Sequence, residues 1–389
     1  MFFWLSIIVG LLSIVGCCYL VIAALLTHRF ISGSGVPSRT SSPGVTILKP
    51  LHGGAPGLAE NITSFCIQNY RGPTQIVFGV QDSKDGAILI VERLRAKYAA
   101  SRLDLVIENT AHGLNQKVSN LINMWGHVEH DIVIVSDSDI RVNSKYLSRI
   151  VAALEQPGVG AVTCLYHGFA AAGPWSRLAA LGINAHFLPN VIVGIEAGLA
   201  RPCFGSTIAF RRKEFAEIGE FVAVANCLAD DYAIGAALRA RGYEIKIPPI
   251  TVGHACAETS VLDLWHREVR WARTIRSIDP IGYAGSIVAH AFPLALIAAL
   301  AGGVAGSVQP VVGIGLCLTA LLCRLTLLGR VEQAFALTSQ SYWLVPVRDL
   351  LSFAVFLWSC FGRNARWKNR QYRFLSGGTL VSSRSSSTP

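Results

Sequence analysis

Charged side chains are scarce in this chain. Of its 389 residues only 15% are Asp, Glu, Lys or Arg, whereas 52% are hydrophobic, and the mean hydropathy is +0.45. Such a chain is too apolar for an ordinary soluble protein. The apolar residues gather at the two ends, and residues 2–26 run without a charge over a length that can cross a bilayer. That stretch lacks the basic start and the clear A-x-A site of a signal peptide, so we interpret it as a membrane anchor.

Acidic residues are the minority among the charges that remain, with 24 Asp and Glu against 34 Lys and Arg and a net charge of +10. The basic residues are dispersed and no aromatic-basic RNA motif occurs, which argues against a nucleic-acid partner. Contact between basic side chains and anionic lipid headgroups explains the excess of positive charge better. His28, Arg29 and Arg39 follow the first span, and no basic side chain precedes it. The positive-inside rule therefore predicts an external N-terminus and a cytoplasmic central domain.

Two familiar motifs are missing. The ten cysteines include no C-x-x-C, so we interpret them as reduced core and membrane residues rather than disulfides or zinc ligands. A predicted strand, Val45–Leu48, leads into the turn Lys49-Pro50-Leu-His-Gly-Gly54. That turn resembles a nucleotide-binding entry, but it is not G-x-G-x-x-G, which disfavours a dinucleotide site and a nicotinamide oxidoreductase.

What the chain does contain is an apolar run that ends on two carboxylates. Residues 132–136 follow Asp131 and lead into Asp137-Ser-Asp139. This pattern predicts a buried strand of a parallel sheet that delivers both carboxylates to its C-terminal edge, where open α/β sheets bind ligands. Two carboxylates at this spacing can share one divalent ion with substrate phosphates. A polar strand end without a metal is the alternative for an isolated D-x-D.

Neighbouring segments strengthen the metal hypothesis. A second predicted strand, 75–81, leads into Asp82, and a third covers 103–108. The segment Gly113-Leu-Asn-Gln-Lys117 then opens a helix, which places Lys117 in its first turn. Acids and a lysine at the ends of neighbouring strands predict a crevice for a nucleotide diphosphate and a metal.

The following part of the chain predicts a strand at 159–166 and then an unusual, nearly uncharged stretch at 170–200 with His186 in its middle. Glycines and prolines interrupt this stretch too often for a confident span. We expect an interfacial element that shapes an entrance for a lipid acceptor, and a core helix and loop remains the alternative. Further strands are predicted at 207–211 and 243–247.

Two more polar motifs follow. Asp230 and Asp231 open a predicted helix, where one acid is commonly an N-terminal cap but two are more than a cap needs. Arg267, Arg270 and Arg273 share one side of a later helix and are suited to a pyrophosphate, although a solvated face or a headgroup contact would use the same residues.

Beyond residue 280 the chain turns apolar. Two spans are predicted at 287–304 and 311–328, and a third apolar block at 342–361 contains Arg348-Asp349. Opposite charges in such a block are costly in lipid, so we expect the pair to face protein or the interface and the block to be re-entrant or interfacial. The predicted division is an N-terminal anchor at 1–27, a linker at 28–44, an α/β domain at 45–278, membrane segments at 279–362 and a basic tail at 363–389.

Four motifs stand in one order: Gln81-Asp82, Asp137-Ser-Asp139, Ala229-Asp-Asp231-Tyr and Arg267-x-x-Arg270-Trp271. Their order resembles the D, D-x-D, (E/D)-D, (Q/R)-x-x-R-W set of membrane-bound inverting glycosyltransferases of family 2/21 type with a GT-A fold. Ceramide glucosyltransferase and its bacterial relatives are most similar, with further matches at Lys49-Pro50, Asn115-Gln-Lys117, His186, Cys203 and the block 343–372. The run Trp271 to Tyr283 resembles the bacterial hopanoid branch, which transfers N-acetylglucosamine to bacteriohopanetetrol. One departure is Asp230, where the ceramide enzymes usually carry Glu.

The resemblance implies a GT-A α/β domain between N-terminal and C-terminal transmembrane helices, in the inner membrane of a bacterium. The donor would be a UDP-sugar, the acceptor a hopanoid or ceramide in the bilayer, and the metal Mg²⁺ or Mn²⁺. The residues that match the family's motifs are expected to act as follows. Asp137 and Asp139 would hold the metal, Lys49, Pro50, Asp82 and Lys117 would line the nucleotide-sugar site, Asp231 would be the general base, Arg267 and Arg270 would neutralise the diphosphate, and His186, Asp230 and Trp271 would contact the acceptor.

Two other protein classes are alternatives. A processive polysaccharide synthase shares the (Q/R)-x-x-R-W motif but needs a membrane channel, for which three or four spans make a poor pore. A membrane-associated binding module would not need Asp137, Asp139 and Asp231 together.

Overall fold

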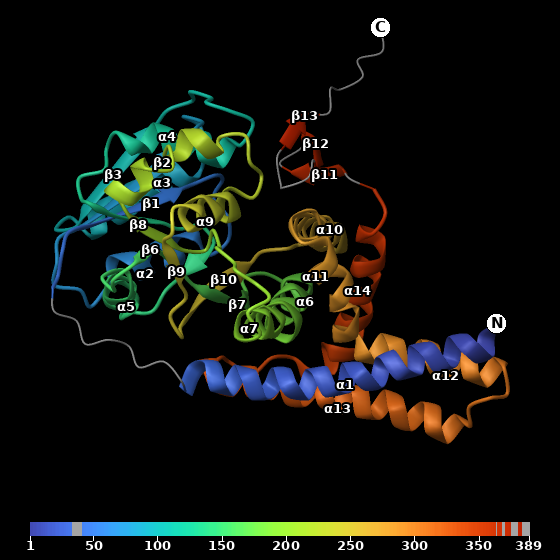
Figure 1. The fold of residues 1–389 in the computed structure, drawn as a ribbon. Helices are drawn as coiled ribbons and strands as arrows, with labels where there is room; N and C mark the ends of the chain where they lie inside the picture. The colour runs from blue at the N-terminus through green and yellow to red at the C-terminus, as the bar shows by residue number, and fades with distance from the viewer. Residues whose placement is uncertain (33–40, 363, 368–369, 375–379, 383–389) are drawn as a thin grey trace, which may run out of the picture. The chain divides into compact units, whose positions relative to one another are not determined.

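The computed structural model describes residues 1–32, 41–362, 364–367, 370–374 and 380–382 (Figure 1). The chain divides into two compact units. The sheet unit comprises the described residues within 34–171, 202–257 and 378–389, and the helical unit those within 1–33, 172–201 and 258–377. Two segments of the predicted 45–278 domain, 172–201 and 258–278, therefore pack within the helical unit. Residues 33–40 of the predicted linker and most of the predicted basic tail lie outside the described residues.

A seven-stranded sheet of order β3-β2-β1-β4-β8-β6-β9 forms the centre of the sheet unit. The strands are β1 (Val45–Pro50), β2 (Thr74–Val80), β3 (Arg102–Ile107), β4 (Ile132–Val135), β6 (Val159–Thr163), β8 (Ile208–Arg211) and β9 (Glu244–Lys246). β3, β2, β1 and β4 are parallel neighbours, whereas β8 runs antiparallel to β4 and β6. The predicted parallel pairing of the Asp137 strand is thus confirmed on its β1 side, and β8 makes the sheet mixed.

Alternate residues of the central strands enter two separate cores. Ile47 and Ile134 belong to one hydrophobic cluster, and their neighbours Leu48 and Val135 belong to the other. Because strand side chains point to opposite faces in turn, the sheet is covered on both sides. The first cluster includes residues of α2 (Leu58–Cys66), α3 (Ala87–Lys97) and α5 (Tyr146–Leu154), and the second those of α4 (Gln116–Trp125), α8 (Arg212–Ala216) and α9 (Asp230–Ala240). This is a three-layer α/β arrangement.

The prediction of a single strand at 159–166 is wrong, because the chain passes there from the seven-stranded sheet to a second, smaller sheet. β6 ends at Thr163, and β7 (Leu165–Ala170) joins a small sheet of order β5-β10-β7 with β5 (Ile140–Arg141) and β10 (Thr251–Cys256). β7 pairs in parallel with β10 from Leu165↔Thr251 to Ala170↔Cys256. A local pattern of hydrophobic residues does not reveal a hydrogen-bonding partner that lies so far along the chain.

The helical unit is almost entirely α-helical. Its elements are α1 (Phe2–Ser32), α6 (Pro174–Gly182), a π-helical turn (Ile183–Phe187), α7 (Leu188–Glu196), α10 (Val261–Ile278), α11 (Pro280–Gly285), α12 (Ala291–Val304), α13 (Pro310–Phe335) and α14 (Val345–Ser359). Short 3₁₀ turns cover Ser286–Ala289 and Tyr342–Leu344 in this unit and Phe221–Val224 in the sheet unit, and the C-terminal strands are β11 (Asn364–Trp367), β12 (Arg370–Phe374) and β13 (Leu380–Ser382). α1 runs beside α12 and α13, where Ser13 donates a 2.9 Å hydrogen bond to the Ala291 carbonyl (Figure 1).

Among the described residues, three helical segments are each long and apolar enough to cross a membrane: Phe2–Ser32, Pro174–Glu196 and Pro310–Phe335. The predicted helices at 2–26 and 311–328 are confirmed, and both extend further. The span predicted at 287–304 falls on a bent pair of helical segments, Pro280–Ala289 and Ala291–Val304, which meet at 66° and are together long and apolar enough for a broken span or a re-entrant loop. α12 starts only after the bend, and Pro293 falls in its first turn, where a missing N–H is tolerated.

The stretch that looked too interrupted for a span is helical from Pro174 to Glu196. The π-helical turn continues α6 into α7, and Pro189 lies in the first turn of α7. Because 67% of its most apolar window is buried inside the protein, protein side chains rather than lipid cover most of this segment.

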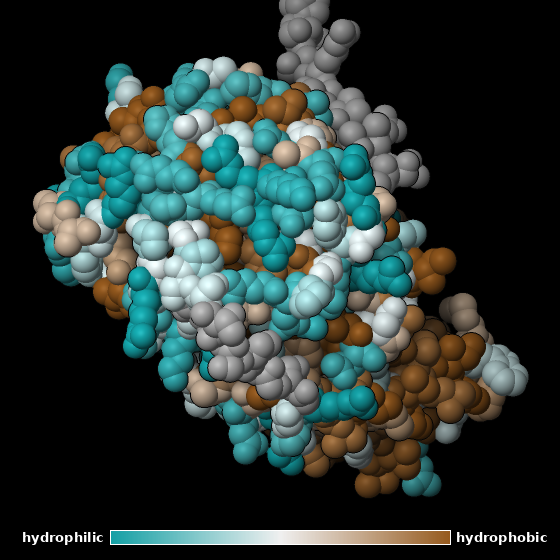
Figure 2. Space-filling model, turned by 60° about the vertical axis from the view of Figure 1, so that its left-hand side comes forward, coloured by the Kyte–Doolittle hydropathy of each residue, from teal (hydrophilic) through white to brown (hydrophobic). Residues whose placement is uncertain are grey.

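Apolar surface gathers over the long helices of this unit (Figure 2). Its exposed residues include Leu11 and Leu25 of α1 and Leu318 and Leu322 of α13. A soluble protein rarely exposes such a contiguous patch, so a bilayer is the natural cover. Of the described helices, α14 is not among those long enough to cross. Its Arg348 and Asp349 are only 4% and 1% exposed, which confirms that the pair faces protein.

Candidate active site

The D-x-D turn directly follows β4. Leu48 of β1 pairs with Val135, and the Ser136 N–H donates to the Leu48 carbonyl at 3.1 Å. The chain then leaves the sheet at Asp137 and Asp139, whose side chains are 36% and 43% exposed. The predicted position of both carboxylates at the C-terminal edge is confirmed.

Lys49, the predicted nucleotide-site lysine at the end of β1, lies beneath this turn. Its side chain is fully buried, and Nζ donates to the Asp137 carbonyl at 2.6 Å and lies 3.9 Å from the centre of the Phe65 ring. Burial lowers the pKa of Lys49 to about 7, although the charges of Asp139 and Asp137 oppose this shift. In this geometry Lys49 supports the backbone of the D-x-D turn.

Lys117 joins the D-x-D turn to the Asp230-Asp231 pair. Its Nζ lies 2.8 Å from Asp137 Oδ1 and 3.4 Å from Asp230 Oδ2. Asn115, the N-cap of α4, accepts from the Lys117 N–H at 3.0 Å and donates to Asp230 Oδ1 at 3.3 Å. Burial alone would lower the pKa of Lys117, but Asp137, Asp230 and Asp231 outweigh it and raise the pKa above its ordinary value. Lys117 is therefore a firmly charged ammonium among carboxylates.

Asp231 is held by two backbone donors. Its Oδ2 accepts from the Gly205 N–H and its Oδ1 from the Tyr232 N–H, both at 2.8 Å. Burial and the neighbouring charge of Asp230 raise the pKa of Asp231 to about 6, even though Lys117 and the two N–H donors act in the opposite direction. A carboxylate with a raised pKa is well placed to accept a proton near neutral pH.

Gly205 lies against three of these groups, and sequence reasoning missed it. A Cβ at this position would lie 2.9 Å from Lys117 Nζ, 3.0 Å from Asp137 Oδ2 and 3.5 Å from Asp231 Oδ2. Its backbone conformation is open to other residues, so the close approach is what requires glycine. The only signal in the sequence was a glycine just before a predicted strand.

His254 is a second residue that the sequence did not indicate. β10 pairs with β5 so that His254 lies opposite Ile140, and its Nδ1 is 3.7 Å from Asp139 Oδ1. That oxygen is buried and accepts no hydrogen bond from any described residue. Among the described residues no group of three or more His, Cys, Asp or Glu side chains is gathered as a metal centre. The carboxylates of Asp137 and Asp139 are hard oxygen donors on partly exposed side chains, and their chemistry nevertheless fits Mg²⁺ or Mn²⁺ shared with substrate phosphates.

Pro50 and Asp82 lie toward the β2 side of the same edge. Pro50 closes β1 and pairs with Gly79. Asp82 follows β2 in an exposed turn, where its Oδ1 accepts from the Lys84 N–H at 2.9 Å. Both positions agree with strand ends at the ligand edge, and the exposed carboxylate is available to a ligand.

The R-x-x-R-W motif lies in α10 of the helical unit. Arg267 forms an ion pair with Glu258, and its guanidinium lies 4.8 Å from the centre of the Trp271 ring. Trp271 in turn contacts Phe187 of the π-helical turn, with ring centres 6.5 Å apart. Arg270 is partly buried one turn after Arg267. Ion pairing and ring contacts thus fix the motif within its own unit.

His186 lies in the same π-helical turn. It is 8% exposed, and its Nε2 lies 2.7 Å from Asp349 Oδ1 of α14. The predicted acceptor-contacting histidine is therefore buried against a carboxylate of the helical unit.

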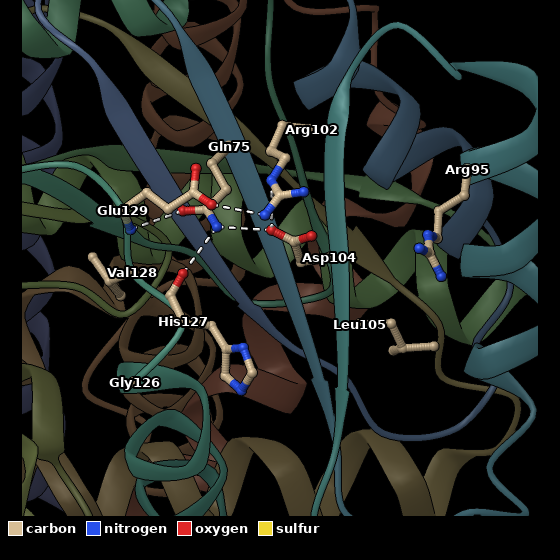
Figure 3. A pocket seen from close by; sticks show the side chains of 9 residues that line it. All are labelled: Gln75, Arg95, Arg102, Asp104, Leu105, Gly126, His127, Val128 and Glu129. Carbon is tan, nitrogen blue, oxygen red and sulfur yellow. Dashed lines mark hydrogen bonds and ion pairs between the residues drawn. The ribbon is translucent and has the colours of Figure 1, made fainter.

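A hollow of about 400 Å³ lies at the opposite edge of the sheet, where β2 and β3 begin (Figure 3). Gln75 donates to Asp104 at 2.8 Å and to the His127 carbonyl at 2.9 Å, and Arg102 pairs with Glu129 at 2.7 Å. Because its polar groups satisfy one another and ligands of α/β sheets bind at the other edge, this hollow is not the candidate site.

The three-layer α/β arrangement, the D-x-D turn and the paired aspartates define a glycosyltransferase of the GT-A fold. The mannosyltransferase PcManGT from Pyrobaculum calidifontis, solved in complex with GDP-Man and Mn²⁺, shares this fold with a TM-score of 0.55 at 18% identity, over 93% of this chain and 99% of that chain.

More specifically, the model of Glycosyl transferase family 21 matches residues 8–380, and the chain belongs to that family. Ceramide glucosyltransferase 3 of Caenorhabditis elegans is 25% identical over 95% of this chain and 83% of its own length. Ceramide glucosyltransferase 1 of the same organism is 23% identical over 59% of this chain and 49% of its own length. The resemblance inferred from the four motifs is confirmed at the level of this family.

Proposed function

We propose that this glycosyltransferase moves a sugar from a UDP-sugar to the hydroxyl group of a membrane lipid with inversion of configuration. The observation that carries the proposal is the placement of Asp231. It is fixed by two backbone N–H groups, its pKa is raised to about 6, and Lys117 links its neighbour Asp230 to the D-x-D turn. A base and a diphosphate site thus belong to one cluster of side chains.

The proposed chemistry is a single displacement. Asp231 accepts the proton of the acceptor hydroxyl while the oxygen attacks the anomeric carbon, and the bond from that carbon to the diphosphate breaks. Mg²⁺ or Mn²⁺ held by Asp137 and Asp139 would supply positive charge for the departing diphosphate. Lys117, Arg267 and Arg270 would bind phosphate oxygens, and Asp82 would bind the uridine. One displacement converts an α-linked donor into a β-glycoside.

The helical unit and the relatives support a lipid acceptor. Helices of a length and hydropathy suited to a bilayer accompany the site in one chain, and the matched relatives are ceramide glucosyltransferases. This supports ceramide with UDP-glucose as one donor and acceptor pair. The run from Trp271 to Tyr283 supports the other pair, bacteriohopanetetrol with UDP-N-acetylglucosamine. In both cases His186, Asp230 and Trp271 would contact the acceptor.

Product analysis tests the proposal. Detergent-purified protein is given Mg²⁺ or Mn²⁺ with each UDP-sugar and each lipid, and the lipid products are identified by mass spectrometry and by the anomeric coupling in their NMR spectra. We expect one β-linked monoglycosylated lipid. A long polymer would instead identify a polysaccharide synthase, and the absence of any glycolipid from all pairs would contradict the proposal.

A further inference from the structure

Arg348 and Asp349, adjacent residues of α14, are charged side chains buried almost completely in the helical unit. In the sequence they are two opposite charges inside the apolar block 342–361. In the structure they point to different partners, and together they connect α14 to four other helical segments.

Arg348 makes a bidentate contact with α10, the helix that carries the R-x-x-R-W motif. Its two terminal nitrogens donate to the two carboxylate oxygens of Glu268 at 2.6 and 2.5 Å. It also donates to the Leu178 carbonyl of α6 at 3.2 Å and to Ser352 at 3.0 Å. Glu268 stands inside the motif, directly after Arg267. α14 therefore holds the motif helix by a bidentate bond that has one favourable orientation.

Asp349 binds two further segments. One oxygen lies 2.7 Å from His186 of the π-helical turn, and the other accepts from Arg324 of α13 at 3.3 Å. Arg324 is completely buried and also donates to the carbonyls of Ala185, at 2.7 Å, and Ala289. The network thus reaches from the motif helix to the π-helical turn and to a helix of membrane-spanning length.

Burying these charges is not an efficient way to stabilise a fold. Removing an ion pair from water costs about as much as its attraction returns, and well-packed apolar side chains often do equally well. What an apolar contact cannot provide is a defined rotation and register of two helices, because it has no preferred direction. Trp271, which packs on the π-helical turn, lies only three residues after Glu268 and would follow any rotation of α10.

We propose that Arg348 and Asp349 are positioning residues: they set the orientation of the R-x-x-R-W helix and of the His186 turn for sugar transfer. This inference rests on the proposed function for its catalytic part, but its structural part can be measured without activity.

The experiment compares three variants of the full chain with the wild type. Arg348→Met leaves Glu268 buried without its partner, Arg348→Lys keeps the charge but loses the planar fork, and the double variant Arg348→Met/Glu268→Met removes both charges. Arg29→Gln is the matched control, since Arg29 pairs with Glu196 at 3.5 Å on the surface of the same unit and is 78% exposed. Tm, UDP-sugar affinity, kcat, the acceptor KM and hydrogen exchange at residues 267–271 are measured for each.

Arg348→Met is expected to lower Tm and to reduce kcat about tenfold or more, because a small misplacement of positioning groups is costly. Arg348→Lys should give an intermediate kcat. The double variant should regain most of the Tm while kcat stays low and exchange at 267–271 stays faster than in the wild type. Because Arg267 and Arg270 of this helix are proposed to bind the diphosphate, UDP-sugar affinity should also fall in Arg348→Met and in the double variant, whereas Arg29→Gln should match the wild type.

Recovery of kcat together with Tm in the double variant would mean that the ion pair between Arg348 and Glu268 only stabilises the fold. That result would overturn the inference. So would an unchanged kcat in Arg348→Met. A wild type that transfers no sugar would contradict the proposed function, and the exchange data would then decide the inference: wild-type protection of 267–271 in the double variant would overturn it, and faster exchange at an unchanged Tm would support it.

Discussion

The two aspartates at the start of α9 differ in their contacts, and this difference supports the different roles that we propose for them. Asp230 is paired with Lys117, whereas Asp231 accepts hydrogen bonds from two backbone N–H groups and has a raised pKa. Replacing Asp231 with Asn keeps the shape of the side chain but removes the proposed base. We expect Asp231→Asn to reduce transfer by about 10²–10⁴-fold, the usual contribution of general base catalysis. UDP-sugar affinity, measured by calorimetry, should stay within about twofold.

Asp104→Asn is the matched control for this variant. It makes the same chemical change at the opposite edge of the sheet, where Asp104 accepts from Gln75 at 2.8 Å. Transfer by this control should stay close to wild type. If Asp231→Asn also retained a near-wild-type rate, Asp231 would not be the base.

Acid pH should inactivate the enzyme through Asp231. Its carboxyl is protonated below its pKa of about 6 and cannot then accept a proton, so the transfer rate should rise with pH through about 6 and level off above it. Because the charge of Lys117 lowers the pKa of Asp231, Lys117→Met should move this acidic limb to higher pH. The pH dependence of the rate, measured with both substrates below their KM, reports the pKa of Asp231 in the free enzyme. An acidic limb that stayed in place in Lys117→Met would show that the lysine does not control this group.

The loop that precedes β8 shapes the site by its backbone. The Gly205 N–H holds Asp231, and a side chain at 205 would press on Lys117 and Asp137. We expect Gly205→Ala to displace the flexible end of Lys117 and to lower transfer about tenfold or more, since loss of the Lys117–Asp137 contact disturbs the arrangement of charges. Tm should change little, because a lysine end can move at small cost. Steady-state kinetics and thermal unfolding check both parts.

Gly126→Ala is the corresponding control. Gly126 follows α4, has an ordinary helical φ of −64°, and would meet no atom within 4 Å if it carried a Cβ. Transfer and Tm should therefore match the wild type. Equal losses in both glycine variants would mean that the effect does not depend on the close approach at Gly205.

The predictions from sequence are correct where the pattern of hydrophobic and polar residues within one element decides the structure. The buried run before Asp137 and the helix that starts at Asn115 have patterns that follow from strand and helix periodicity, so the positions of Asp137, Asp139 and Lys117 could be inferred. His254 could not, because it reaches Asp139 through the pairing of β10 with β5, more than a hundred residues apart in sequence. The partner of Arg348 is equally non-local. Long-range strand pairing and helix packing decide these contacts, and a single sequence does not display them.

The chain as a whole interleaves its two units. The helical unit takes in three separate segments, and the shortest, 172–201, contains His186. The sequence predicted spans near the two ends of the chain and an interfacial element at 170–200. Because this internal segment folds with the terminal helices, His186 and the helices of membrane-spanning length belong to one unit, and this arrangement suits the proposed lipid acceptor.

The orientation of the chain in a membrane can be tested directly. His28 and Arg29 lie in the C-terminal part of α1 and Arg39 follows in the sequence, and basic residues beside a span favour the cytoplasmic side, so we expect the sugar-binding face to lie in the bacterial cytoplasm. A UDP-sugar carries two phosphates and does not cross lipid unaided. Inverted inner-membrane vesicles should therefore transfer labelled sugar from external UDP-sugar without detergent, whereas right-side-out vesicles should do so only after permeabilisation. The opposite pattern, with permeabilised vesicles of both kinds equally active, would place the site on the outer face.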